Sequence, residues 1–93
     1  MNIKQEDTGS KGKFYYEVGG VEKAQMTYSH AGKDKIIIDH TEVDESLQGQ
    51  GIGYAMVDAA VSYARENEMK IMPLCPFANS VFRKKEEYSD VRF

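Results

Sequence analysis

Apolar residues of the first half of the chain gather in three short stretches, the second of which alternates with polar residues and the third of which is rich in β-branched residues, and these stretches predict three β-strands. The stretches are residues 13–18, 21–30 and 35–43. Gly19-Gly20 and residues 31–34 separate them and are typical of tight turns, so consecutive strands are expected to pair antiparallel. In the second stretch Ala24, Met26 and Tyr28 share one face, as in a strand with one side in water. Residues 1–12 are interpreted as a flexible lead-in that can hold a short strand at its start.

The second half of the chain has a different period. Apolar residues recur there at helical spacing and predict an amphipathic helix from about Gly53 to Asn67: Ile52, Met56, Ala59, Ala60 and Tyr63. Residues 70–74 predict a fourth strand, parallel to the third because a right-handed helical crossover connects the two. Pro76 is typical of the first position of a helix, and this second helix is expected to fade near Tyr88. The predicted fold class is α/β, a mixed sheet in which an antiparallel N-terminal meander is followed by a βαβα unit.

Strict alternation divides the third strand into two faces. One face is predicted to hold Ile36, Ile38, His40 and Glu42, and the other Ile37, Asp39, Thr41 and Val43. Both faces are apolar at the start of the strand, which favours a central strand with helices on each side.

The segment between the third strand and the first helix is rich in glycine: Gln48-Gly49-Gln50-Gly51-Ile52-Gly53. Such a turn presents free backbone N–H groups at the positive end of a helix dipole, which is a typical phosphate site. A Cβ at the alternate glycines would block both the backbone dihedrals and the close approach of a phosphate. The alternative is that the glycines serve only to turn the chain.

Two common phosphate loops do not match this segment. A P-loop needs Lys and Ser or Thr after its last glycine, where this chain has Tyr54-Ala55. The dinucleotide fingerprint needs a later third glycine and a second βα half, which a chain of 93 residues cannot supply. Gln48-x-x-Gly51-x-Gly53 instead resembles the Gln/Arg-x-x-Gly-x-Gly/Ala signature of the GNAT superfamily of N-acetyltransferases. The run from His40 to Gly53, together with Leu74-Cys75-Pro76-Phe77, is similar to small single-domain GNAT-like proteins of the YjdJ type, and the resemblance covers roughly residues 35–88.

The resemblance implies a minimal GNAT-like fold whose loop binds the pyrophosphate of acetyl-coenzyme A, the acyl donor. It also implies that the third and fourth strands splay apart to admit the cofactor. The residues that it places against coenzyme A are Thr41, Val43, Gln48, Gly49, Gln50, Gly51, Ile52, Gly53 and Asn79. Gln48 stands where many members have Arg and can only hydrogen-bond. The implied reaction is transfer of an acetyl group to an unidentified amine, and the elements that usually build the acceptor site are missing. The alternatives are a coenzyme A-binding sensor or carrier with little activity, and an interaction module that lost the ligand.

Three residues are candidates for catalysis. His40 and Glu42 share a strand face near the splay, and either could be the base that takes a proton from the amine, with Glu42 the stronger candidate. The alternative is that both side chains only face a helix or solvent. Glu86 occupies the position of the family's proton-donating tyrosine, and Tyr88 lies two residues further on.

Cys75 is the expected N-cap of the last helix, where the dipole favours thiolate and lowers the pKa. One interpretation is a reactive thiol near the acyl end, which protonates the leaving thiolate, accepts the acyl group or forms a mixed disulfide with coenzyme A. The other interpretation is a small buried residue.

Composition limits the partners. The chain is expected to form one domain, residues 1–93, and its net charge of −3 argues against nucleic acid or an anionic membrane as the main partner. A single cysteine and the lack of a long apolar segment favour a cytoplasmic protein. A metal site from His30, Asp39 and His40 has no tight ligand spacing to support it, so no metal is expected.

Overall fold

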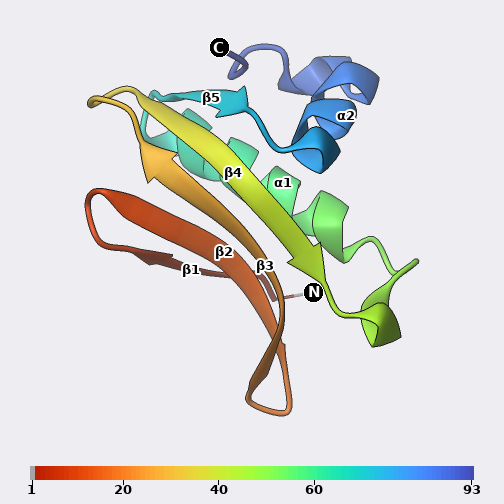
Figure 1. The fold of residues 1–93 in the computed structure, drawn as a ribbon. Coiled ribbons are helices and arrows are strands. Elements are labelled where there is room, and N and C mark those ends of the chain that lie inside the picture. Colours follow the sequence, from red (N-terminus) through yellow and green to blue (C-terminus); the bar gives the residue numbers. More distant parts are fainter. Residues whose placement is uncertain (1) are drawn as a thin grey trace.

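The antiparallel meander predicted from three short strands and their tight turns is present, and it continues into a mixed five-stranded sheet with the strand order β1-β2-β3-β4-β5 (Figure 1). The protein is described here by a computed structural model that covers residues 2–93; Met1 of the expected lead-in lies outside the described residues. The strands are β1 (Lys4–Asp7), β2 (Lys11–Val18), β3 (Val21–His30), β4 (Lys35–Val43) and β5 (Lys70–Pro73). The helices are α1 (Ile52–Glu66) and α2 (Pro76–Lys84), with short 3-10 turns η1 (Glu45–Leu47) and η2 (Glu86–Tyr88).

The turns follow from local chemistry. Gly19 and Gly20 have φ values of 59° and 81°, and a two-residue hairpin with positive φ at both positions matches the twist of the flanking strands. The segment expected to be a lead-in contains β1, which pairs with β2 from Lys4 opposite Tyr15 to Asp7 opposite Gly12. The short strand expected there is therefore present.

The βαβα unit has the predicted connections. Asn67 is the C-cap of α1, Pro76 opens α2, and β5 pairs parallel with β4. The far edge of β5 is covered by the end of the chain: the Ile71 N–H donates to Val91 O over 2.6 Å, and the Phe93 N–H donates to Ile71 O over 2.8 Å. None of the described helices is long and apolar enough to cross a membrane.

A β-bulge in β4 overturns the predicted division of its faces. Thr27 of β3 lies opposite His40, but Tyr28 lies opposite Ile38, so Asp39 is an extra residue on β4. The bulge reverses the alternation beyond it. Thr41 and Val43 therefore continue the face of Ile36 and Ile38, while His40 and Glu42 point to the opposite side.

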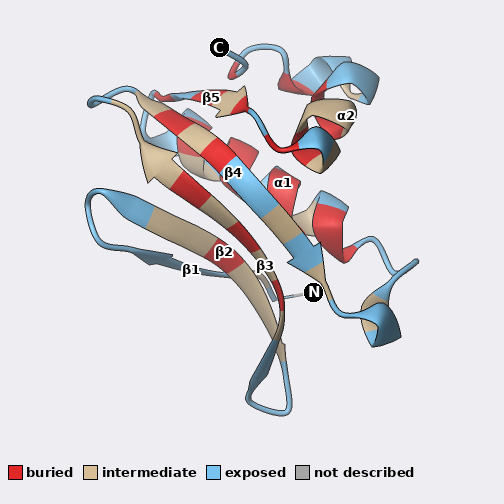
Figure 2. Ribbon diagram, in the orientation of Figure 1, coloured by how far each residue is buried: buried red, intermediate tan, exposed pale blue. Residues whose placement is uncertain are grey.

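The expectation that helices cover both faces of β4 is wrong as well. Ile36 and Ile38 are fully buried, whereas Ile37 is only partly buried and His40 and Glu42 are exposed (Figure 2). α1 lies along one side of the sheet, and α2 packs beside β5 and the start of α1 (Figure 1). One face of the sheet therefore carries the core.

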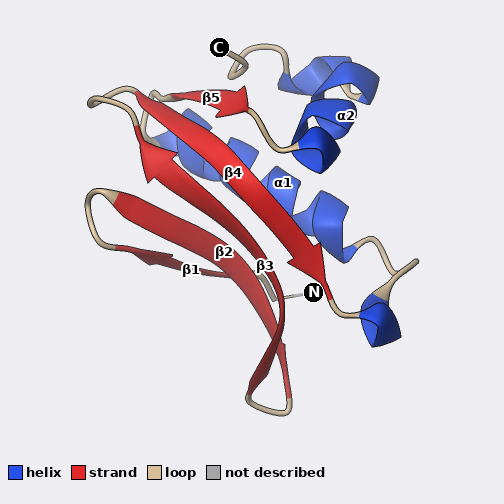
Figure 3. Ribbon diagram, in the orientation of Figure 1, coloured by secondary structure: helices blue, strands red, loops and turns tan. Residues whose placement is uncertain are grey.

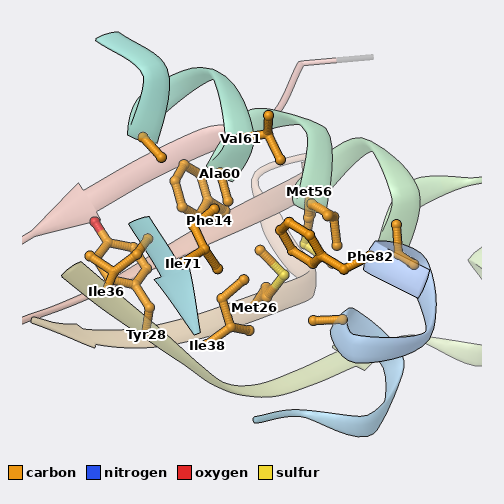
Figure 4. Close-up of a cluster of buried hydrophobic side chains, with 14 of the residues drawn as sticks. Phe14, Met26, Tyr28, Ile36, Ile38, Met56, Ala60, Val61, Ile71 and Phe82 are labelled. Atoms are coloured by element: carbon orange, nitrogen blue, oxygen red, sulfur yellow. The ribbon is translucent and has the colours of Figure 1, made fainter. Parts of the chain in front are cut away.

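The core joins the sheet to both helices (Figure 4). Met26 and Tyr28 of β3 belong to the same cluster as Met56 and Val61 of α1, and all four are buried. Alanines at 60 and 64, also fully buried, allow α1 to approach the sheet closely. Each large side chain buried in this way contributes about 1.5–3 kcal/mol from removal of apolar surface from water. The resulting framework holds the end of β4 and the start of α1 in fixed positions.

Candidate active site

The parallel pair β4 and β5 opens halfway along β4. Their pairing ends with Ile38 opposite Pro73, and Ile38 O then accepts bonds from the Leu74 N–H (3.2 Å) and the Cys75 N–H (3.1 Å). Beyond this point the chain leaves the sheet for α2, while β4 continues to Val43 without a neighbour on that side (Figure 3). The expected splay of the two strands is thus present.

A cleft of about 600 Å³ lies where β4, the glycine loop and α2 meet. It is lined by Thr41, Val43, Leu47, Gln48, Gly49, Gly51, Ile52, Gly53, Tyr54 and Phe77. The structure thus gathers all the residues expected to bind coenzyme A except Gln50 and Asn79. Gln50 is exposed, and the Asn79 side-chain oxygen accepts a bond from Arg92 over 2.9 Å.

Three lining residues were not expected from the sequence. Leu47 and Tyr54 flank the glycine loop directly, so proximity in sequence could have indicated them. Phe77 lies 24 residues beyond Gly53, and its ring packs against Tyr54 with the centroids 5.7 Å apart and the planes at 80°. Only the packing of α2 on α1 brings Phe77 to the cleft.

The backbone of the glycine loop is rich in unpaired donors. Within residues 2–93, the N–H groups from Gly49 to Tyr54 donate to no protein acceptor, and the first N–H of this region to do so is that of Ala55, which bonds Gly51 O over 3.0 Å. Gly51 is the N-cap of α1 and offers no side chain to satisfy them. Consecutive free N–H groups at the positive end of a helix dipole are suited to an anion.

The glycines of the loop have two different roles. Gly49 and Gly51 have φ values of 82° and 77°, a conformation that favours glycine, and a Cβ at either would meet no atom within 4 Å. Gly53 is helical, and a Cβ there would lie 2.6 Å from the Phe77 ring. At Gly53 the missing Cβ therefore makes room for Phe77, a packing role that the sequence did not indicate and that comes in addition to the predicted phosphate role.

Cys75 joins the two sides of the splay. It has the extended backbone of an N-cap residue of α2, as expected, but its side chain makes no capping bond. The side chain is 4% exposed, and its thiol donates instead to Thr41 Oγ1 over 3.2 Å. The free thiol therefore lies beside Thr41, one of the β4 residues that line the cleft. Its burial also agrees with the alternative interpretation of Cys75 as a small buried residue.

His40 and Glu42 form a pair on the uncovered face of β4. His40 Nε2 and Glu42 Oε1 are 2.8 Å apart, and both side chains are more than half exposed. Glu42 borders a second cleft of about 490 Å³, which shares Thr41, Val43 and Gln48 with the first. His40 lines neither cleft and reaches them only through its bond to Glu42.

Tyr88 is held away from the cleft. Its hydroxyl donates to Asp58 Oδ1 over 2.9 Å, and burial, with this bond to a carboxylate, raises the pKa of Tyr88 to about 12. His30 is likewise engaged elsewhere, 2.8 Å from Asp7 Oδ2. Among the residues that the structure describes, no three His, Cys, Asp or Glu side chains are placed to hold a metal ion.

Comparisons with known proteins agree with this architecture. The family model described as GCN5-related N-acetyl-transferase matches residues 13–91. A GCN5-like protein of Staphylococcus aureus is 38% identical, with a TM-score of 0.77 and coverage of 99% of this chain and 87% of that chain. A protein of Clostridium acetobutylicum solved with acetyl-CoA has a TM-score of 0.65, but at 20% identity it shows the fold alone; 80% of this chain and 55% of that chain are covered.

Curated relatives extend the match to vertebrates. Protein NATD1 of Xenopus tropicalis is 27% identical over 75 residues, which are 80% of this chain and 69% of that protein. Protein NATD1 of Danio rerio is 32% identical over 57 residues, which are 61% of this chain and 52% of that protein.

The splayed mixed sheet and its glycine loop define an acetyltransferase-like domain. The chain belongs to the GCN5-related N-acetyltransferase family.

Proposed function

We propose that the protein is a small N-acetyltransferase, which binds acetyl-coenzyme A in the first cleft and transfers the acetyl group to an amine. The observation that carries this proposal is the run of unpaired N–H groups from Gly49 to Tyr54 at the mouth of that cleft. Acetyl transfer is the chemistry of the family, and the Clostridium acetobutylicum neighbour was solved with acetyl-CoA. The same proposal places the protein in the cytoplasm, because its one cysteine is a free thiol.

The cleft suits each part of the donor. The free amides take the pyrophosphate, and Gln50 and Gln48 are close enough in sequence to add neutral contacts. Beyond Ile38, β4 has no strand on its β5 side, so its main chain at Thr41 and Val43 can pair with the extended pantetheine arm as an added strand would. The acyl end then lies toward Thr41 and Cys75. Asn79, although bonded to Arg92, remains part of this proposal through the family resemblance.

The transfer needs two proton movements and one bond exchange. The new C–N bond forms as the C–S bond of the thioester breaks, and the proton lost by the amine passes to Glu42, directly or through water. His40, bonded to Glu42, orients that carboxylate and can share the proton. In this proposal the Cys75 thiol, which donates to Thr41, returns a proton to the leaving thiolate. Most of the rate enhancement then comes from positioning.

A second candidate function is a coenzyme A-binding module with little or no transfer activity. The observation that favours it is the exposure of His40 and Glu42 on an uncovered sheet face, because no wall there excludes water from an acceptor amine. A third, an interaction module without a ligand, has no observation in its favour.

Thermal unfolding with acetyl-coenzyme A, coenzyme A or ATP tests the binding step. At a ligand concentration of 100 times Kd, binding stabilises the folded state by about 2.7 kcal/mol, which raises Tm by roughly 10 °C or more in a domain of this size. We expect this shift with both coenzyme A species and not with ATP. No shift with either coenzyme A species would contradict the proposal and its binding-only alternative together.

Release of free thiol with a panel of small amines and peptides then separates transfer from binding alone. We expect thiol release that depends on both substrates, and Glu42→Gln should lower its rate more than it lowers affinity for acetyl-coenzyme A. Unchanged turnover of Glu42→Gln across the pH range would show that Glu42 is not the base.

The role of Cys75 is tested by alkylation, since the protein has no other cysteine. If the thiol is activated at the helix start, iodoacetamide should label native Cys75 faster at pH 7 than it labels the unfolded chain, and acetyl-coenzyme A should protect it. Slower labelling of the native protein without protection by the ligand would leave Cys75 as a packing residue.

A further inference from the structure

The segment that follows α2 is hydrogen-bonded to α1 at several points. The Tyr88 hydroxyl donates to Asp58 Oδ1 over 2.9 Å. Further along, Arg65 donates to Glu87 O over 2.6 Å and to both oxygens of Asp90, from Nε over 3.0 Å and from Nη2 over 2.9 Å. These bonds tie Tyr88 near the second turn of α1 and residues 87–90 near its end. Lys85, which precedes them, is therefore brought to the first turn of α1, beside the glycine loop.

The surroundings of Lys85 confirm this position. Its Nζ lies 5.8 Å from the ring centroid of Tyr54 and 5.7 Å from that of Tyr88. Tyr54 lines the first cleft and carries the last of the unpaired N–H groups. Two aromatic faces attract the ammonium group and hold it beside Tyr54, a residue that lines the cleft.

No acidic group of the described residues neutralises this ammonium. Lys85 forms no salt bridge within residues 2–93. The surrounding elements carry Asp58 on α1, which accepts the Tyr88 hydroxyl, and Glu86 and Glu87, which directly follow Lys85 in sequence. The positive end of the α1 dipole and the Lys85 charge thus add at one place, and an anion bound there would be attracted by both.

We propose that Lys85 binds a phosphate of coenzyme A and extends the anion site of the glycine loop. This proposal rests on the proposed function, because the first cleft must hold coenzyme A for Lys85 to contact it. Coenzyme A carries phosphate in two places, the pyrophosphate and the 3′-phosphate of its ribose. Either group would meet the ammonium with the same chemistry, a charge-assisted hydrogen bond at the rim of the cleft.

Isothermal titration calorimetry of matched charge variants tests the proposal. Lys85→Gln removes the ammonium, and Lys84→Gln makes the same change of net charge on the neighbouring exposed residue in the last turn of α2. The ligands are coenzyme A, 3′-dephospho-coenzyme A, and pantetheine, which has no phosphate. We expect Lys85→Gln to raise Kd for coenzyme A about fivefold, with Lys84→Gln close to the wild type and Lys85→Arg largely restored.

The ligand series identifies the phosphate. A loss seen with coenzyme A but not with 3′-dephospho-coenzyme A assigns Lys85 to the 3′-phosphate, and an equal loss with both assigns it to the pyrophosphate. The loss should shrink at high ionic strength, and binding of pantetheine should not depend on Lys85.

Two results overturn the proposal while leaving the proposed function standing. They are unchanged affinity of Lys85→Gln for coenzyme A, and an equal loss in Lys85→Gln and Lys84→Gln, which would indicate a general charge effect. Thermal unfolding of each variant confirms that it is folded. If the wild-type protein itself binds no coenzyme A, the proposed function fails, and with it the role of Lys85.

Discussion

The two ends of α1 both gather polar groups, but only one end provides them with partners. Near the end of the helix, the Asp7 carboxylate accepts bonds from Tyr28 (2.6 Å), His30 (2.8 Å), the Gly9 N–H (2.7 Å) and, more weakly, Tyr63 (3.4 Å). At the start of the helix, the N–H groups from Gly49 to Tyr54 have no protein acceptor among the described residues. A saturated cluster stabilises the fold, whereas an unsaturated one is available to a ligand.

The difference shows why a concentration of polar groups is a poor guide to function by itself. The Asp7 cluster contains a histidine, a carboxylate and two tyrosines, which are residue types common in active sites. Its geometry instead ties β1 to β3 and to α1, and Gln5 adds a bond to the Tyr28 hydroxyl over 2.8 Å. The glycine loop has hardly any reactive side chain, yet its backbone carries the binding proposal. Mutations at the two ends of α1 should therefore affect different properties.

The largest expected effect is on ligand binding, from Gly51→Asp. The new carboxylate would place negative charge among the free amides, and we expect Kd for acetyl-coenzyme A to rise by at least about 100-fold, equivalent to about 2.7 kcal/mol. Calorimetry on the folded variant measures this loss.

Gly20→Asp is the matched control for that experiment. Gly20 has a φ of 81°, close to the 77° of Gly51, and a Cβ at either would meet no atom within 4 Å. The control therefore shares the backbone strain and the added charge, but it lies in the β2–β3 hairpin. Equal affinities of the two variants would contradict the assignment of the loop.

The second expected effect is on stability, from Asp7→Asn at the other end of α1. We expect the free energy of unfolding to fall by about 1–2 kcal/mol, because the charged acceptor of several hydrogen bonds is lost, while Kd for acetyl-coenzyme A stays unchanged. Urea unfolding with calorimetry on the same samples checks both parts. A variant with unchanged stability but weaker binding would reverse the comparison between the two ends.

The pH dependence of stability tests the same cluster. Burial by itself would raise the pKa of Asp7, but the bonds from Tyr28, His30 and the Gly9 N–H outweigh it and lower that pKa from its ordinary 3.8 to about 2. Ionised Asp7 therefore stabilises the fold above about pH 4, and this contribution is lost as the pH falls toward 2. Over that range the wild type should lose more stability than Asp7→Asn; parallel curves would show that Asp7 is not responsible.

The smallest expected effect is at Gly53, which belongs to the loop by sequence and to the core by packing. The higher helix propensity of alanine should raise the free energy of unfolding of Gly53→Ala by up to about 1 kcal/mol, but the new methyl group overpacks Phe77. We expect a net decrease in the free energy of unfolding of about 1 kcal/mol. In a Phe77→Ala background the space is free, and Gly53→Ala should then stabilise the protein. Urea unfolding of the four variants measures this coupling, and an identical effect of Gly53→Ala in both backgrounds would exclude the contact with Phe77 as the cause.

Much of the architecture could be predicted because it depends on local patterns. The Gly19-Gly20 turn, the period of α1 and the proline that opens α2 each involve residues close in sequence, and each prediction is confirmed. The alternation in β4 failed because a bulge is decided by pairing with β3. Nothing within residues 35–43 indicates that Asp39 has no residue opposite it on β3.

The candidate site divides in the same way. The sequence by itself determined the strand, the glycine loop and the helix start, because left-handed glycines and unpaired N–H groups are consequences of the local chain. Only the tertiary structure turned Thr41 toward Cys75, directed His40 and Glu42 to the uncovered face, set Phe77 against Gly53 and brought Lys85 to Tyr54. These contacts join residues distant along the chain. They arise when the sheet, α1 and α2 bury a common apolar surface. The free energy gained by removing that surface from water depends on all three elements together and on no single segment.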